Sequence, residues 1–312
     1  MTHPILITGA AGGQQGSTGR VIATTLLQQR IPVRAFIHKL DARSDELRRQ
    51  GAEIFEGDLL NPASVQQAME NVKRAYFTYP VVDGLLEAAT IFAASARAAG
   101  LELVVNNSQF QGTSDDPTFR DLRYAPSFRN LQHRLGDRIF DWAQVGAVHL
   151  QAPPYYENVR ALVSHSVAEQ NTVFLPWGEG SAAVPLAGAE DVARVAIALL
   201  ASPSLPSETV YPLVSETPTV REIVETLGRV LGRPIRYVPI TDEQWADAVN
   251  ERLNPHAMDH LGHLWQHLRK GERYPTTDTV RAVTGHNPQT LEEFFRVNAG
   301  SFSADAARST SI

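Results

Sequence analysis

The chain has 312 residues, of which 43% are hydrophobic and 20% are charged, and its formal net charge is −6. This balance is typical of a globular protein with one large domain or two unequal ones, and the negative charge argues against general, direct binding of nucleic acid. The chain has no cysteine, which excludes disulfides, thiolate chemistry and cysteine-based zinc sites. No apolar run reaches the roughly 18–20 residues that span a bilayer. A strand is expected within four residues of the start, so we expect a cytoplasmic protein without a signal peptide and without membrane contact.

The most informative segment lies at the N-terminus. The apolar run 5–7 is followed by a glycine-rich turn and then by a helical pattern with one apolar face. A strand, a glycine turn and a helix in this order are typical of the first βαβ unit of a dinucleotide-binding fold. Glycine lets the backbone approach a pyrophosphate, and the amide groups at the helix start face its negative charge. Gly9 and Gly12 have the usual spacing, whereas the third glycine is either Gly16 or Gly19.

Apolar segments and helical patterns then alternate along the first half of the chain. The further expected strands cover 32–37, 53–56, 74–78, 101–105 and 147–150. The expected helices between them cover 44–50, 62–69, 84–99 and 121–143, the last one mainly after Pro126. Strict β/α alternation predicts a parallel sheet with helices on both faces, and right-handed crossovers favour the doubly wound form.

The alternation becomes less regular after residue 153. We expect helices over 190–200, from a capping box at 219–222 to residue 230, over 242–268, 276–284 and 291–298, and short strands over 210–214 and 235–239. The predicted organisation is a cofactor-binding domain over 1–153 and a smaller α+β substrate domain over 154–300. Segments around 185–214 are expected to return to the first domain, and the small, polar tail 301–312 is predicted to be disordered.

Several motifs resemble those of atypical short-chain dehydrogenases, namely Gly-Ala-Ala-Gly at 9–12, Gly-Asp-Leu-Leu-Asn-Pro at 57–62 and Asn-Ser at 107–108. The motifs at 190–193, 221–228, 277–285 and 290–295 resemble those of the NmrA-like subgroup. The resemblance spans about residues 4–300. It implies a doubly wound Rossmann domain, a smaller C-terminal substrate domain, and NAD(P) in the cleft. That family includes NAD(P)H-dependent quinone, azo-dye and triphenylmethane-dye reductases, and also redox-sensing regulators that bind the cofactor without evident turnover.

The resemblance also selects among the glycines and places further cofactor contacts. The usual helix length before the second strand favours Gly19 as the third glycine, with about four residues inserted in the phosphate loop. Asp58 matches a residue that cradles adenine in the family, although it could instead only cap a turn. Segments that follow the fourth and fifth strands should border the nicotinamide, because ligands bind at the carboxyl edge of such sheets. The residues expected to contact the cofactor are Gly9, Gly12, Gly16, Gly19, Arg20, His38, Lys39, Asp58, Leu59, Tyr79, Pro80, Asn107 and Pro153.

The end of the second strand bears on the choice between NAD and NADP. An acidic residue there binds the ribose 2′-hydroxyl, whereas a basic one favours a 2′-phosphate. This chain has His38 and Lys39 at that place, with Arg43 nearby. Lys39 or Arg43 could pair with the phosphate, or both could be solvated surface charges. We expect NADP(H) in preference to NAD(H).

The catalytic positions depart from the family pattern. Short-chain dehydrogenases normally use Tyr-x-x-x-Lys, with the tyrosine as acid and the lysine lowering its pKa. Alignment with the family places His133 at the lysine position and Arg129 where the tyrosine would be, and Tyr124 has the wrong spacing. We expect His133 to hydrogen-bond the nicotinamide ribose or to donate a proton, with Ser108 as the second catalytic residue. The alternative is that His133 is a partly buried histidine that fixes its helix.

Hydride transfer to an electron-poor ring needs little acid help, because the cofactor carries the difficult chemistry. An aromatic pocket would suit that task. Gln109 follows the fifth expected strand, and Tyr155 and Tyr156 follow the sixth, so we expect these three residues to contact the substrate. Each tyrosine could instead belong to the core.

Four histidines, at positions 256, 260, 263 and 267, suggest a metal site, and the last three could share one helix face. Asp259 is the only carboxylate among them, and the family that the chain resembles has no metal. We therefore expect a polar helix face and no metal.

The sequence thus predicts an NAD(P)H-binding oxidoreductase that passes hydride from NADPH to a quinone-like or conjugated aromatic small molecule. The alternative is a catalytically weak regulatory protein that senses NADP(H). A homodimer or a regulatory protein partner is also left open. A nucleotide-sugar epimerase is disfavoured, because that chemistry relies on the missing tyrosine.

Overall fold

A computed structural model describes residues 3–12, 17–111, 127–251, 253–271 and 274–303. Seven parallel strands form the central sheet in the order β3-β2-β1-β4-β5-β6-β8. They are β1 (Ile5–Ile7), β2 (Val33–Ile37), β3 (Glu53–Glu56), β4 (Arg74–Phe77), β5 (Leu103–Gln109), β6 (Ala147–Ala152) and β8 (Val210–Pro212). The strand order reverses between β1 and β4, and the crevice at such a reversal is where open α/β sheets bind ligands.

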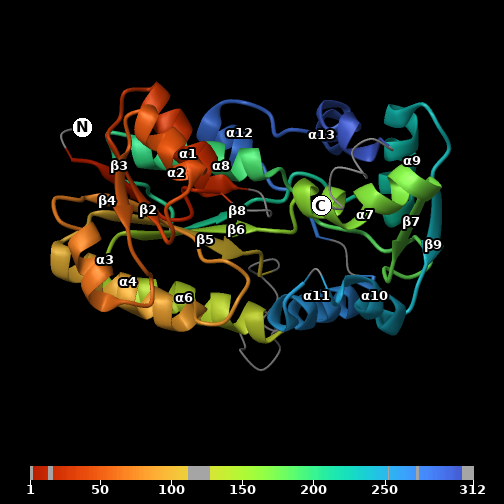
Figure 1. Cartoon of the computed structure of the whole chain (residues 1–312), viewed down its shortest axis with the longest axis horizontal. Helices are drawn as coiled ribbons and strands as arrows, with labels where there is room; N and C mark the ends of the chain where they lie inside the picture. The colour runs from red at the N-terminus through yellow and green to blue at the C-terminus, as the bar shows by residue number, and fades with distance from the viewer. Residues whose placement is uncertain (1–2, 13–16, 112–126, 252, 272–273, 304–312) are drawn as a thin grey trace.

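Helices cover both faces of this sheet (Figure 1). On one face lie α1 (Thr18–Gln28), α2 (Ala42–Arg49), α8 (Ala189–Ala201) and α12 (Thr279–Thr284). On the other face lie α3 (Pro62–Ala68), α4 (Leu85–Ala99) and α6 (Phe128–Ala143). Alternate residues of each strand bury their side chains against one helix layer or the other, so that Val105 packs on the first face and Val104 on the second. The predicted doubly wound α/β fold is confirmed.

A second hydrophobic core lies beside the sheet. It is formed by α7 (Tyr156–Gln170), α9 (Val220–Leu231), α10 (Asp242–Val249), α11 (Pro255–Leu268), α13 (Leu291–Val297) and a two-stranded parallel sheet of β7 (Thr172–Leu175) and β9 (Arg236–Pro239). The helix expected over 242–268 is two helices, because Asn254 caps a new helix that begins at Pro255. Among the described residues, no helix is both long and apolar enough to traverse a bilayer.

The C-terminal tail begins later than expected. A short 3₁₀ helix covers Ala299–Phe302, and its Phe302 is fully buried against Phe295, with ring centroids 5.8 Å apart. The disorder predicted from residue 301 is therefore wrong for 301–303, because an apolar side chain there completes the second core. Residues 304–312 lie outside the described part of the chain.

Candidate functional site

The glycine turn after β1 brings the backbone of α1 against the strand. Gly9 and Gly12 have φ angles of +65° and +78°, a region that side-chain-bearing residues rarely adopt. A Cβ atom on Gly19 would lie 2.8 Å from the Gly9 carbonyl oxygen and closer still to the Thr8 oxygen. Gly19 therefore allows the close helix–strand packing that the third glycine of a dinucleotide fingerprint provides. Gly16, the alternative third glycine, lies outside the described residues.

The carboxyl ends of four strands are joined by a chain of polar contacts. The Thr78 amide donates to Thr8 Oγ1 (2.8 Å), and Asn107 Nδ2 donates to Thr78 Oγ1 (3.4 Å). Tyr155 Oη donates in turn to Asn107 Oδ1 (3.2 Å), and burial raises the pKa of Tyr155 to about 12. Asn107 and Tyr155 therefore both lie at the sheet edge, where we expected them.

The segment after β2 places a cation at the glycine turn. The Arg43 guanidinium donates to the Gly12 carbonyl (3.2 Å) and pairs with Asp41 (2.6 Å), and Arg20 donates to the Arg43 carbonyl (2.8 Å). Asp41 also caps α2. His38 and Lys39 follow β2 directly and are exposed. Arg43 is therefore a cation that lies against the described part of the glycine turn.

Asp58 has the local role that we considered as the alternative to adenine binding. Its carboxylate accepts from the Leu60 amide (2.9 Å), and its own amide donates to Ser64 Oγ (3.1 Å), which closes the turn before α3. The Asp58 side chain is exposed and Leu59 is partly buried. Both residues remain accessible beside the end of β3.

A buried arginine holds the loop that follows β4. The Arg129 guanidinium donates to the main-chain oxygens of Tyr79 (3.3 Å), Pro80 (2.8 Å) and Val82 (3.1 Å). Burial lowers the pKa of Arg129 to about 10, and the arginine still carries its charge at neutral pH. The residue at the family's tyrosine position therefore shapes the rim of the crevice.

His133 lies on α6 between Arg129 and His260. Burial, with the charges of Arg129 and His260, lowers its pKa well below the ordinary value, so its imidazole is neutral at pH 7. His133 does not line the pocket described below. This position does not support the acid role that we predicted for His133, because the ring packs at the junction of α6 and α11. Tyr124 lies outside the described residues.

Ser108 belongs to a buried polar network centred on Asp137. The Asp137 carboxylate accepts from Asn106 Nδ2 (2.8 Å), Ser108 Oγ (3.0 Å) and Gln111 Nε2 (2.6 Å). His149 Nδ1 lies 3.3 Å from the same carboxylate. Burial raises the pKa of Asp137, and the charge of His149 and the bonds from Ser108 and Gln111 partly offset that rise. Ser108 is thus engaged by a carboxylate that the sequence analysis did not pair with it.

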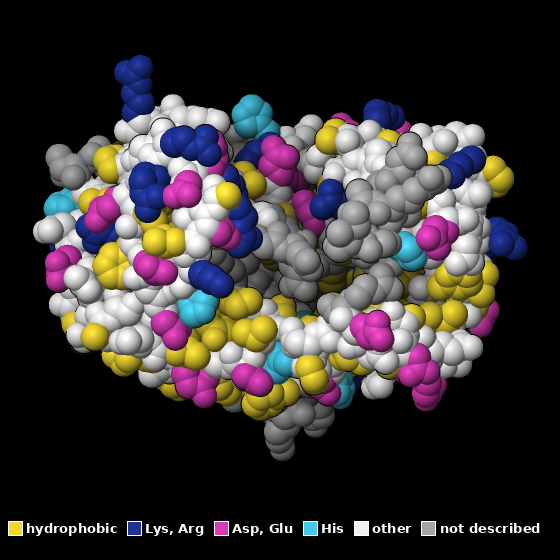
Figure 2. Space-filling model, in the orientation of Figure 1, with side chains coloured by type: hydrophobic (Ala, Val, Ile, Leu, Met, Phe, Trp, Pro, Cys, Tyr) yellow, Lys and Arg dark blue, Asp and Glu magenta, His cyan; other side chains and the backbone are white. Residues whose placement is uncertain are grey.

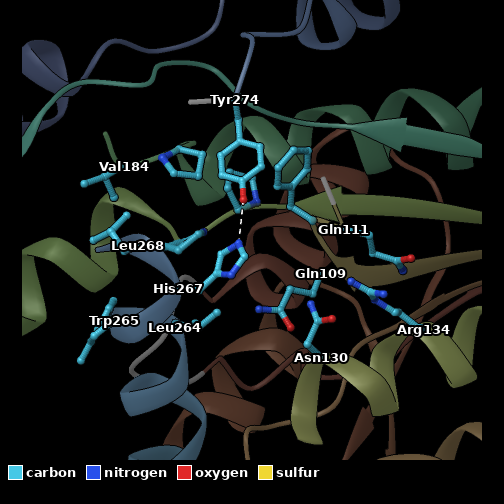
Figure 3. A pocket seen from close by; sticks show the side chains of 14 residues that line it. Gln109, Gln111, Asn130, Arg134, Val184, Leu264, Trp265, His267, Leu268 and Tyr274 are labelled. Atoms are coloured by element: carbon cyan, nitrogen blue, oxygen red, sulfur yellow. Dashed lines mark hydrogen bonds between the residues drawn. The ribbon is translucent and has the colours of Figure 1, made fainter. Parts of the chain in front are cut away.

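A hollow of about 700 Å³ lies beyond the carboxyl ends of β5 and β6, between α6 and α11 (Figure 3). Figure 2 shows the molecule hollowed between the half with the large sheet and the half with α10 and α11. The lining residues are Gln109, Phe110, Gln111, Asn130, Arg134, Pro153, Pro154, Val184, Pro185, Leu264, Trp265, His267, Leu268 and Tyr274. Most of them are apolar, and the polar groups gather at Gln109, Gln111, Asn130 and Arg134 on one side and at His267 and Tyr274 on another.

Among the residues expected in the site, Gln109 and Pro153 line this hollow, whereas Tyr155 and Tyr156, both expected to contact the substrate, do not. Tyr156 is fully buried in the second core against Phe294, and its hydroxyl donates to the Gln289 carbonyl (3.1 Å). The substrate contact predicted for Tyr156 is therefore wrong, because the start of α7 turns this side chain away from the hollow.

The sequence analysis missed Asn130, Arg134, His267 and Tyr274. The first two stand one helical turn apart on α6, and this spacing is the only signal that could have paired them. His267 was noticed only as one of four histidines, and Tyr274 lies in an irregular segment without a motif.

The histidines of α11 each have a separate partner. His256 pairs with Asp83 (3.1 Å) and His260 bonds Ser127 Oγ (2.9 Å), while His263 lies beside the Asp259 main-chain oxygen (2.8 Å). Burial lowers the pKa of His260 to about 3. Within the described ranges, no group of three or more histidine or carboxylate side chains is arranged to hold a metal ion. His256 and His260 instead join α11 to the loop after β4 and to the start of α6.

Comparison with known proteins relates the chain to a family. Residues 1–118 match the model of the NmrA-like family. The chain is similar to the NmrA-like family over this first part of its length. An NAD(P)H azoreductase of Xenophilus azovorans is 24% identical over 294 residues, which cover 94% of this chain and 98% of the azoreductase.

Two solved structures share the fold of this chain. One is the triphenylmethane reductase of Citrobacter sp. complexed with NADP(H), with a TM-score of 0.77 and 20% identity over 95% of this chain and 99% of the reductase. The other is an NADPH-dependent quinone oxidoreductase of Escherichia coli complexed with NADPH, with a TM-score of 0.77 and 18% identity over 98% of this chain and 99% of the oxidoreductase.

Proposed function

We propose that this chain is an oxidoreductase that binds NADP(H) and passes hydride to a quinone-like or conjugated aromatic acceptor. The observation that carries the proposal is the adjacency of two features at one sheet edge. A glycine turn at which Gly19 lets α1 pack closely on β1, as in a dinucleotide fingerprint, follows β1, and a largely apolar hollow lies beyond β5 and β6. An apolar hollow with a few convergent polar groups is typical of a small-molecule site.

Chain residues fit the cofactor along this edge. Gly9 and Gly12 give the turn its positive φ angles, and Gly19 lets α1 pack closely on β1, so the amide groups at the start of α1 would bind the pyrophosphate. The Asn107–Tyr155 pair and the Pro80 rim would border the nicotinamide end. The bound cofactor supplies the hydride. The walls of the hollow would stack a flat acceptor and exclude water, which orients the reacting atoms.

The preference for NADP(H) is expected to depend on Arg43. An Arg43→Ala variant should bind NADPH about tenfold more weakly and NADH equally well, because only the 2′-phosphate gains a charge-assisted bond from the guanidinium. Lys39→Ala is the matched control, since Lys39 is exposed and, within the described part of the chain, forms no hydrogen bond or ion pair with the glycine turn. Isothermal titration calorimetry of both variants measures the dissociation constants of NADPH and NADH. Equal losses for NADPH and NADH would contradict the assignment.

Turnover tests the function itself. Oxidation of NADPH is followed at 340 nm with a panel of naphthoquinones, azo dyes and triphenylmethane dyes. We expect steady oxidation with at least one member of the panel. Tight NADPH binding with no turnover on any acceptor would rule out the reductase function.

A second function, cofactor-dependent regulation, is favoured by one observation. Arg129 and His133 occupy the positions of the family's catalytic pair and are both used in packing. In that case the chain would bind reduced and oxidised cofactor with different affinities. The protein partner that it binds would depend on which form of the cofactor is bound. Equal affinities for NADPH and NADP⁺, together with acceptor turnover, would exclude it.

A further inference from the structure

We propose that Tyr274, assisted by His267, donates the proton that completes reduction of the acceptor in the hollow. This inference rests on the proposed reductase function. In short-chain dehydrogenases a tyrosine and a lysine supply the proton, and α6 has neither residue. The Tyr274–His267 pair would supply the proton from another wall of the site.

The two side chains meet in the wall of the hollow. His267 stands near the end of α11, and its Nε2 atom lies 2.8 Å from Tyr274 Oη (Figure 3). Both residues line the hollow, and their polar atoms point toward one another beside its apolar walls. A phenol that is hydrogen-bonded to an imidazole can donate its proton, and the imidazole can then pass a proton back to the phenolate.

The position of the phenol is fixed by packing. The Tyr274 ring meets Phe110 edge to face, with centroids 5.4 Å apart and an interplanar angle of 89°. Its main-chain oxygen accepts from Thr217 Oγ1 (2.9 Å). Phe110 follows β5 directly and its amide donates to the Ala152 carbonyl of β6 (2.8 Å), so the phenol is held against the carboxyl edge of the sheet. Such preorganisation is what a proton donor requires.

Among the described residues that line the hollow, elimination of the other polar groups leads to the same pair. Gln109, Gln111 and Asn130 carry amides, which do not release protons near neutral pH. Burial lowers the pKa of Arg134, yet a guanidinium still holds its proton at pH 7. The remaining lining residues are apolar, apart from His267 and Tyr274. Ser108 and His133, the acids expected from the sequence, do not line the hollow.

The step balances as a two-electron, two-proton reduction. Hydride adds to one atom of the acceptor's conjugated C=O or N=N system, and the π electrons move to the other terminus. The Oη–H bond of Tyr274 breaks as a new O–H or N–H bond forms at that terminus. A proton from water then returns to the phenolate through the His267 imidazole, which accepts a proton at one ring nitrogen and donates one from the other.

The experiment compares the full-length wild type with Tyr274→Phe, His267→Gln and the control Tyr237→Phe. The Tyr274→Phe change keeps the ring on Phe110 and removes only the hydroxyl. The control removes a hydroxyl that bonds the main-chain oxygens of Leu175 (3.1 Å) and Gly178 (2.8 Å) outside the hollow. The probes are 1,4-naphthoquinone and an azo dye, with NADPH as reductant. Quenching of tryptophan fluorescence, to which Trp265 in the wall of the hollow contributes, reports acceptor binding without turnover.

We expect Tyr274→Phe to lower kcat about 100-fold or more, as loss of a general acid does. KM, the dissociation constant of NADPH and the quenching curve should change less than about threefold. The solvent deuterium isotope effect on kcat should change in Tyr274→Phe and in His267→Gln but not in Tyr237→Phe. In ¹⁵N-histidine NMR spectra of the cofactor-free protein, the His267 ring signals should shift when Tyr274 becomes Phe.

Two results overturn the inference and separate it from the proposed function. If the wild type turns over and Tyr274→Phe keeps its kcat within threefold, Tyr274 is not the donor, while the reductase function stands. If the wild type reduces no acceptor, the reductase function fails and the proton-donor role fails with it. Unchanged His267 signals in Tyr274→Phe would overturn the assistance by His267.

Discussion

Replacing Gly19 by alanine is expected to weaken NADPH binding by roughly tenfold or more, which corresponds to about 1.4 kcal/mol. The added methyl group would meet the main chain of Thr8 and Gly9, and backbone atoms cannot move aside as a flexible side chain does. Helix α1 would have to shift away from β1, which changes the distance between the glycine turn and the helix start. Overpacking of this kind also lowers the free energy of unfolding by about 1–3 kcal/mol. Calorimetric titration with NADPH and urea unfolding measure the two effects.

Gly262→Ala is the matched control for this substitution. Gly262 lies within α11, and an added Cβ would meet no heavy atom within 4 Å. Alanine in a helix interior is favoured over glycine by roughly 1 kcal/mol, so the control should be neutral or slightly more stable. An unchanged affinity for NADPH in Gly19→Ala would show that the pyrophosphate does not lie at this turn.

The sequence predicted the large sheet well because its signals are local. Each strand of the first half is a short apolar run bounded by polar or glycine residues, and both faces of a parallel sheet are buried. Helix α7 and strand β7 were missed. Buried Val159, Val163 and Val167 do recur every four residues in α7, but charged and polar residues between them hide the pattern.

The candidate site was predictable only in part, for a physical reason. The glycine turn and the residues that directly follow β4 and β5 are placed by topology alone, so Gly19, Pro80 and Asn107 could be assigned to the sheet edge. The second wall of the hollow comes from α11 and the segment after it. The sequence does not show that Tyr274 packs on Phe110, because only the association of the two cores brings these rings together.

Alignment positions also failed to predict the partners of charged side chains. Arg129 was expected near a catalytic position. In the structure it holds the loop after β4 by hydrogen bonds to three main-chain oxygens. The sequence analysis gave Asp137 no role, yet it is the centre of the buried network that holds Ser108. The degree of burial determines the free-energy cost of a charged side chain and the partners that it needs. A single sequence indicates burial only through the periodicity of its apolar residues.

The largest expected loss of stability follows from Asp137. Asp137→Asn should lower the free energy of unfolding by about 3 kcal/mol, because it removes one partner of a buried ion pair. The amide would also place a donor where Ser108 and Gln111 both donate. Urea unfolding at pH 7 measures this loss. A change below about 0.5 kcal/mol would mean that the network contributes little to stability.

The same network makes stability depend on pH through His149. Burial alone would lower the pKa of His149, but the carboxylates of Asp137 and Asp141 outweigh it and raise that pKa above its ordinary value. When protonated, the ring donates to Asp137 from Nδ1 and to Asp141 from Nε2; when neutral, its Nδ1 accepts from Asn106 instead. A raised folded-state pKa means that this stabilisation is complete below about pH 6.5 and is lost as the pH rises through the folded value.

Wild-type protein should therefore lose stability as the pH rises above about 6.5, and His149→Asn should lose much less. Asparagine can replace the neutral Nδ1 contact but cannot carry the charge that the two carboxylates stabilise. His165→Asn is the matched control: this half-exposed histidine faces Glu169 at 3.4 Å on one helix, and such surface pairs contribute about 0–1 kcal/mol. Urea unfolding at four pH values tests all three proteins. If His149→Asn kept the wild-type slope, the alkaline loss would have to come from another group, and the buried imidazole would be neutral throughout.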